Sequence, residues 1–187
     1  MYTASALNGG VTELSATHVG VSGLAEVTIV YEADLLDGEE NDALVEAFAS
    51  ASPSNADLPE LTYPLDGVSV PRNLEGLAFQ WDMPQGTNAS RIRMTTDITD
   101  IRIHTTDDTW MSNSDLWSLI VASNTEGNVS VRIESGTWDG SRLTDVQRGP
   151  RTALTVNRLD ARGSVLYWAL RVAEPGAGEE GSGDIMR

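Results

Sequence analysis

Apolar and polar residues alternate in short runs along most of the chain, the pattern of strands that bury one face. The runs that predict strands lie at residues 26–31, 77–81, 90–95, 100–105, 128–134, 151–157 and 164–170. In the run at 100–105, Ile101 and Ile103 alternate with Arg102 and His104, so His104 is expected on the solvent face beside Arg102. Residues 97–99 separate the runs at 90–95 and 100–105, which predicts a hairpin.

Two segments have helical spacing instead. Residues 42–51 place Leu44, Val45 and Phe48 on one face, with Asn41 or Asp42 as the N-cap. Residues 114–123 place four positions on one helical face and begin with Ser114, a favourable N-cap. Those four positions are Leu116, Leu119, Ile120 and Ser123.

Short strands with turn residues between them predict an all-β, antiparallel sandwich or barrel with one short inserted helix. The expected core contains the inward apolar positions of these elements. They are Leu77, Phe79, Trp81, Ile92, Met94, Ile101, Ile103, Leu116, Leu119, Ile120, Val129, Val131, Ile133, Leu154, Val156, Leu166 and Trp168.

Composition divides the chain into three zones. Residues 1–57 contain few large apolar residues and are expected to be the end of a preceding domain, or a flap on the next one. Residues 58–174 are the expected β-sandwich body. Residues 175–187 are rich in Gly and Glu, the composition of a flexible linker, and are expected to lead to a missing downstream domain.

The net charge of −16 comes from 28 acidic residues and 12 basic residues, all of them Arg. A GC-rich genome or a salty habitat would each explain this balance. Because the Arg residues are scattered along the sequence and the net charge repels polyanions, we expect no nucleic-acid partner. The longest apolar run is too short to span a bilayer, so no membrane insertion is expected. There is no Cys, which excludes disulfides and thiolate chemistry.

The segment at residues 63–81 resembles the opening of fibronectin type III-like domains, in which a Pro-containing first strand precedes a strand that ends in a core Trp, here Trp81. Further segments are similar to Ig-like or fibronectin-like modules of large extracytoplasmic bacterial proteins of the myxobacterial type. Those segments are Leu116-Trp117-Ser118-Leu119-Ile120, Trp138-Asp139-Gly140, Asp145-Val146-Gln147-Arg148-Gly149, Thr155-Val156-Asn157-Arg158 and Gly163-Ser164-Val165-Leu166-Tyr167-Trp168. The resemblance implies a fibronectin III/Ig-like sandwich of about seven strands. It also implies a preceding Ig-like domain and a TolB-type β-propeller that follows.

Candidate chemistry is sparse. His18 and His104 are the only histidines, and no Gly-x-Ser-x-Gly elbow is present, so no catalytic residue is predicted. Five aspartates fall in one stretch but are expected at turns, where backbone hydrogen bonding favours Asp. They are Asp97, Asp100, Asp107, Asp108 and Asp115. The acidic run at 34–42 fails the spacing of a calcium loop, so no metal and no cofactor are predicted.

Trp110 and Trp138 are expected in loops, where exposed indole rings could stack on a sugar. The leading hypothesis is a non-catalytic structural or interaction module in an extracellular, periplasmic or cell-surface protein. Its expected partners are neighbouring domains of the same chain, and possible ligands are a protein or a glycan. The alternative is a carbohydrate-binding module that uses Trp110 and Trp138, and a glycoside hydrolase is a remote third.

Overall fold

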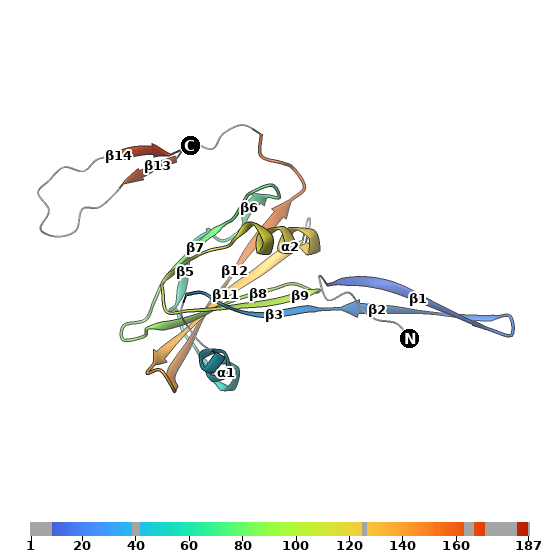
Figure 1. Ribbon diagram of the computed structural model, residues 1–187, viewed down its shortest axis with the longest axis horizontal. Coiled ribbons are helices and arrows are strands. Elements are labelled where there is room, and N and C mark those ends of the chain that lie inside the picture. Colours follow the sequence, from blue (N-terminus) through green and yellow to red (C-terminus); the bar gives the residue numbers. More distant parts are fainter. Residues whose placement is uncertain (1–8, 39–41, 125–126, 163–166, 171–182, 187) are drawn as a thin grey trace, which may run out of the picture.

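The computed structural model describes residues 9–38, 42–124, 127–162, 167–170 and 183–186, the last two segments by their backbone only. Figure 1 shows the arrangement of the elements. The helices are α1 (Asp42–Ser50) and α2 (Ser114–Asn124). The strands are β1 (Gly10–His18), β2 (Val21–Ile29), β3 (Tyr31–Leu36), β4 (Ser54–Asn55), β5 (Glu60–Tyr63), β6 (Val68–Pro71), β7 (Ala78–Asp82), β8 (Ala89–Thr95), β9 (Thr99–Thr105), β10 (Thr109–Met111), β11 (Asn128–Trp138), β12 (Leu143–Asn157), β13 (Tyr167–Leu170) and β14 (Gly183–Met186).

The protein is mostly β, as the alternating pattern predicts. The largest sheet has seven strands, six of them in the order β3-β9-β8-β11-β12-β4, and β6 pairs with β12 beside them. A second sheet has the order β10-β7-β5. The central pairs of the large sheet are antiparallel, but β3 runs parallel to β9, and β4 and β6 run parallel to β12. The expectation of a purely antiparallel fold is therefore wrong at the edges of the large sheet.

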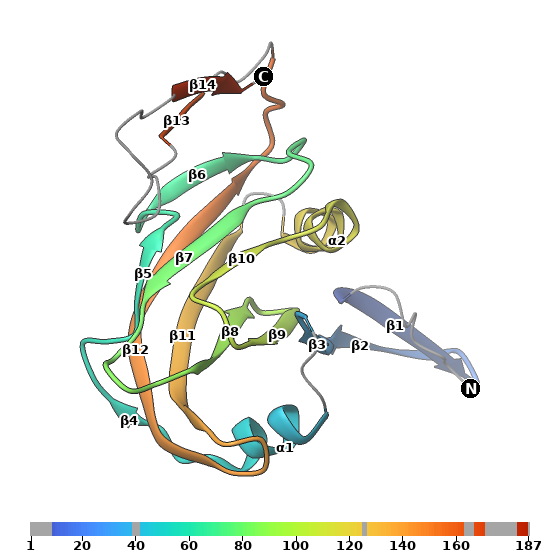
Figure 2. The same cartoon turned by 60° about the vertical axis from the view of Figure 1, so that its left-hand side comes forward.

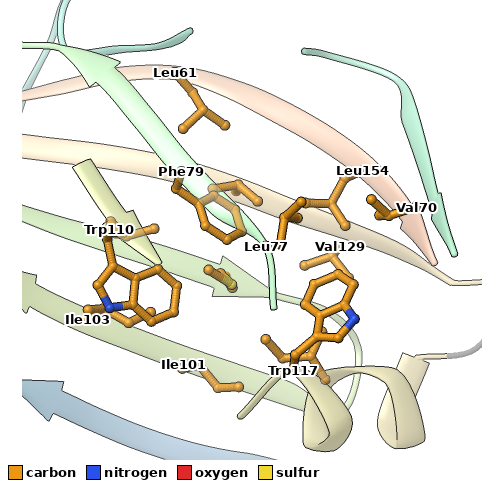
Figure 3. Close-up of a cluster of buried hydrophobic side chains, with 14 of the residues drawn as sticks. Leu61, Val70, Leu77, Phe79, Ile101, Ile103, Trp110, Trp117, Val129 and Leu154 are labelled. Carbon is orange, nitrogen blue, oxygen red and sulfur yellow. The ribbon is translucent and has the colours of Figure 1, made fainter. Parts of the chain in front are cut away.

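Side chains from both sheets and from α2 form one hydrophobic core (Figure 3). Phe79 and Trp81 of β7 contribute from the smaller sheet, and Ile92 and Met94 of β8 from the larger one. The expected core positions are buried, except that Leu116 and Leu119 are only partly buried. Leu166 and the Trp168 side chain lie outside the described residues.

Both expected helices are present. The N-cap of α2 is Asn113 rather than Ser114, because the Asn113 side-chain oxygen accepts a hydrogen bond from the backbone N–H of Leu116 at 2.8 Å. The helix turns Trp117 and Ile120 into the core, each 1% exposed. The face predicted from Leu116 and Leu119 is thus rotated by about one residue toward Trp117.

The segment before residue 58 takes part in the large sheet. β3 pairs with β9 along its whole length, and β4 pairs with β12. Helix α1 buries Leu44 and Phe48 completely, near the hairpin end of β11 and β12 (Figure 2). The boundary expected between residues 57 and 58 therefore runs through one hydrogen-bonded sheet.

Strands β1 and β2 form a separate two-stranded hairpin that projects from the end of β3 (Figure 1). Its turn is Val19-Gly20, where both residues have positive φ, the geometry of a tight hairpin turn. Most side chains in its outer half are exposed, including Val21 and Leu24. No helix among the described residues is both long enough and apolar enough to cross a bilayer.

Candidate functional site

The two faces of the large sheet differ in chemistry because apolar and polar residues alternate along its strands. On β8 and β9 the apolar positions Ile92 and Ile103 point into the core, and the polar positions point to the opposite face. We call this opposite side the outer face. Helix α1 covers one end of it, where Phe48 packs near Arg91 and His104. The remainder of the outer face carries charged side chains and hydroxyl groups.

Strand register aligns four arginines across four neighbouring strands. Arg102 of β9 lies opposite Arg93 of β8, Arg93 lies opposite Arg132 of β11, and Arg132 lies opposite Arg151 of β12. We call these four residues the arginine row. Neighbouring strands are ~4.8 Å apart, and like charges directly opposite one another are destabilising. The row therefore costs stability unless each charge has a partner.

A bulge in β12 places Arg148 on the same face as the row. Between the pairs Arg132–Arg151 and Glu134–Arg148, strand β11 advances by two residues and β12 by three. The extra residue falls at Gly149-Pro150. Proline has no backbone N–H to donate to a neighbouring strand, and a bulge is a place where a strand tolerates it. A Cβ on Gly149 would lie 1.6 Å from the Pro59 carbonyl oxygen, so this position requires glycine. The bulge brings Arg148 and Arg151 to one face, although simple alternation would separate them.

One half of the row is neutralised. Arg93 makes two hydrogen bonds to the Asp100 carboxylate, each 2.9 Å long, and Arg102 binds both Asp100 and Asp34. Burial raises the pKa of Asp100, but the hydrogen bonds from Arg93 and Arg102 outweigh it and hold the pKa below its usual value. Asp100 is therefore a strand residue in an ion-pair network rather than the turn residue that was expected.

The other half of the row is not neutralised. Within the described part of the chain, neither Arg132 nor Arg151 has an ion pair, and the Nε of Arg132 is buried without a hydrogen-bond partner. Burial lowers the pKa of Arg132, and the charges of Arg151, Arg148 and Arg93 lower it further. Two positive groups thus lie side by side without an acidic partner among the described residues.

The next row of the sheet is a buried ion-pair cluster. Glu134, 1% exposed, lies between Arg91 on β8 and Arg148 on β12 and accepts hydrogen bonds from both, that from Arg148 at 2.6 Å. Burial raises the pKa of Glu134, but Arg148 and Arg91 together hold it below its usual value. The Arg91 guanidinium also lies 5.2 Å from the centre of the Phe48 ring. This cluster fixes Arg148, so Glu134 is a partner for the arginines beside the row rather than for Arg132.

Two adjoining pockets open on the outer face. The first has a volume of about 450 Å³ and is lined by Arg93, Arg132, Arg148 and Arg151, among others. The second has a volume of about 700 Å³ and extends toward the end of α2. Four residues line both pockets, so the pockets are contiguous, and we call the two together the outer groove. The shared residues are Thr95, Thr96, Ser130 and Arg151.

His104 lies on the same face as Arg102, as predicted, but it is not a surface residue. Its side chain is fully buried because Phe48 of α1 packs on it, with ring centres 5.6 Å apart. Its Nε2 is 2.9 Å from an Asp34 carboxylate oxygen. Burial lowers the pKa of His104, and the carboxylate of Asp34 only partly opposes this. The expectation of a solvent-exposed histidine is wrong because the covering helix comes from a distant part of the sequence.

The two candidate tryptophans are not brought together. Trp110 belongs to β10 rather than a loop, is 8% exposed, and packs with its ring centre 5.5 Å from that of Phe79 (Figure 3). Trp138 ends β11, is partly buried, and packs against the cluster around Leu44 and Phe48 on the outer face. The expected loop positions are therefore wrong for both residues, and the two rings lie on opposite sides of the large sheet.

Sequence reasoning missed the arginine row because it treated the arginines as scattered. They are scattered along the chain, but six of the twelve meet on the outer face, and the full set is Arg91, Arg93, Arg102, Arg132, Arg148 and Arg151. The available signal was that all of them except Arg148 occupy polar positions within predicted strands. The strand order and the bulge were also needed to align them.

No protein-family model matches the chain, and no curated protein matches it at a significant level.

Proposed function

We propose that this chain is a non-catalytic interaction module of a larger extracytoplasmic bacterial protein, and that it binds an acidic partner in the outer groove. The proposal includes the fold type, in which the three-stranded and seven-stranded sheets are the two layers of a fibronectin III/Ig-like sandwich. The core shared by the two sheets supports this fold type. The parallel edge strands β3, β4 and β6 are additions to that pattern.

The observation that carries the binding proposal is the pair Arg132 and Arg151. In a chain of net charge −16, two adjacent guanidinium groups that have no ion pair with any described residue carry an electrostatic cost. A residue arrangement that costs stability and lines an open pocket is typical of a binding site. An anionic ligand would remove the cost, because Arg forms paired hydrogen bonds with oxyanions.

The geometry of the acidic residues supports binding rather than hydrolysis. A glycosidase requires two carboxyl groups that face the scissile bond, one of them with a raised pKa. Asp100 and Glu134 both have lowered pKa values, because each is held by two arginines. His104 is covered by Phe48 and bound to Asp34, so a substrate does not reach its imidazole.

The test is binding to immobilised polymers of different charge at low ionic strength. We expect retention on at least one polyanion and none on neutral dextran, with retention that decreases as salt is added. The absence of retention on every polyanion would contradict the proposed function. The proposed extracytoplasmic location has a separate test. It predicts a secretion signal upstream in the reading frame that encodes the chain.

A further inference from the structure

We propose that the outer groove binds an acidic polysaccharide built from uronic acids, with one sugar carboxylate held between Arg132 and Arg151. This inference rests on the proposed function and names its ligand class. It follows from three features of the groove, namely the spacing of Arg132 and Arg151, which have no ion pair among the described residues, the carboxylates beside them, and the hydroxyl groups along the groove.

The first feature is the geometry of the cations. Arg132 and Arg151 are direct cross-strand partners, so their side chains leave the sheet about 5 Å apart on the same face. A guanidinium group donates two parallel hydrogen bonds to a planar carboxylate. A single carboxylate above the two strands can therefore accept hydrogen bonds from both side chains. It would supply the buried Nε of Arg132 with the acceptor that the described residues lack.

The second feature is the carboxylates in the same pocket. Asp100 and Glu134 line it beside the arginines, and both keep their negative charge because their pKa values are lowered. A ligand with dense charge, such as a nucleic acid or a heavily sulfated glycan, would place further anions close to these carboxylates. A uronic acid carries one charge per sugar and hydroxyl groups on its other carbons. Those hydroxyls can donate hydrogen bonds to Asp100, whose side chain is partly exposed.

The third feature is the set of hydroxyl groups that lies in both parts of the groove, beside apolar side chains such as Val11 and Ile98. Thr95 and Ser130 face each other across β8 and β11 in the row next to the arginines. In the adjoining pocket the Ser123 hydroxyl is buried and has no hydrogen-bond partner among the described residues. Arginine clusters also bind acidic peptides, so the polyglutamate titration below distinguishes a peptide from a sugar chain. Hydroxyl groups over two contiguous pockets match an extended sugar chain.

The experiment is calorimetric titration of the full chain with oligogalacturonates, galacturonic acid monomer, fully methyl-esterified oligogalacturonates, dextran sulfate and polyglutamate. We expect the oligogalacturonates to bind best. The monomer should bind more weakly because it fills only part of the groove, and the ester should not bind because it lacks the charge. Arg132→Gln and Arg151→Gln should each weaken binding about 10-fold or more, as loss of a charged hydrogen-bond donor does. Arg142→Gln removes the same charge from an exposed site outside the groove and should leave the affinity unchanged.

Several results would overturn the inference while leaving the proposed function in place. Polyglutamate or dextran sulfate binding as tightly as the oligogalacturonates would exclude selection for uronic acids. Equal affinity for the monomer would identify a site for small hydroxy acids. Equal losses for Arg142→Gln and Arg151→Gln would indicate only a general charge effect. Because Arg151 is exposed, its variant keeps the test valid should Arg132→Gln fail to fold.

Discussion

At the scale of single residues, Arg132 and Glu134 show how position within one strand decides the effect of a charge. The two are neighbours on the outer face of β11. Glu134 is buried between Arg91 and Arg148 and bonds to both, whereas Arg132 lies between Arg93 and Arg151. Replacing these two residues should therefore change stability in opposite directions.

We expect Glu134→Gln to lower the free energy of unfolding by about 3 kcal/mol, because it leaves two partly buried guanidinium groups without their carboxylate. The folded-state pKa of Glu134 is lowered, so its contribution is complete above the ordinary value of 4.5 and is lost as pH falls through the folded-state pKa. The difference between wild type and variant should therefore shrink in acid. Urea unfolding at neutral and acidic pH measures both effects.

Two controls accompany this measurement. Arg132→Gln should leave the free energy of unfolding unchanged or raise it, because it removes repulsion from Arg93 and Arg151. Glu26→Gln, on an exposed position of the hairpin, should have little effect. An unfolding free energy for Glu134→Gln equal to that of wild type would show that the buried cluster does not stabilise the fold.

At the scale of elements, the alternating pattern predicted the long strands β7, β8, β9, β11 and part of β12, and helical spacing predicted both helices, because each pattern depends only on nearby residues. It placed Ile101 and Ile103 on the core face and Arg102 on the other. It could not predict the burial of His104, which depends on Phe48 from a helix more than 50 residues away in sequence. It could not reveal the arginine row either, because the row depends on which strands are neighbours, and it could not place Arg148 beside Arg151, because the bulge at Gly149-Pro150 breaks the period of two.

The same elements predict where the chain can be shortened. Strands β1 and β2 pair only with each other, and two-stranded hairpins contribute little stability alone. A chain that begins at Val30 should keep a cooperative unfolding transition, with a melting temperature within roughly 2–4 °C of the full chain, the shift that ~1 kcal/mol produces at this size. A chain that begins at Leu58 loses β3, α1 and β4. It therefore loses the pairing of β3 with β9 and the helix that covers His104.

Circular dichroism during heating of both truncated chains makes this comparison. We expect a sharp transition for the first and a broad one, or aggregation, for the second. A chain that begins at Leu58 and melts like the full protein would restore a domain boundary between residues 57 and 58. It would also show that α1 and β3 are dispensable for the large sheet.

At the scale of the whole molecule, the charge is unevenly distributed. The outer face carries six arginines against four carboxylates, and the latter are Glu32, Asp34, Asp100 and Glu134. The chain as a whole has a net charge of −16, so the rest of the molecule is strongly acidic. The acidic surface keeps the protein apart from dense polyanions, whereas the outer groove attracts a single negative group at short range. The negative net charge first suggested that the chain repels anionic ligands. The local excess of arginine on the outer face removes this objection.

Salt should therefore change stability and binding in opposite directions. Raising NaCl from about 20 mM to about 500 mM screens the repulsion among the acidic groups, so the melting temperature should rise. The same screening weakens the attraction between an oxyanion and Arg132 with Arg151, so the affinity for oligogalacturonates should fall. Differential scanning calorimetry and titration in matched buffers measure the two quantities. An affinity that stays constant over this range would mean that the charges of the arginine row do not hold the ligand. A melting temperature that falls would mean that the ion pairs of Asp100 and Glu134 outweigh the general repulsion.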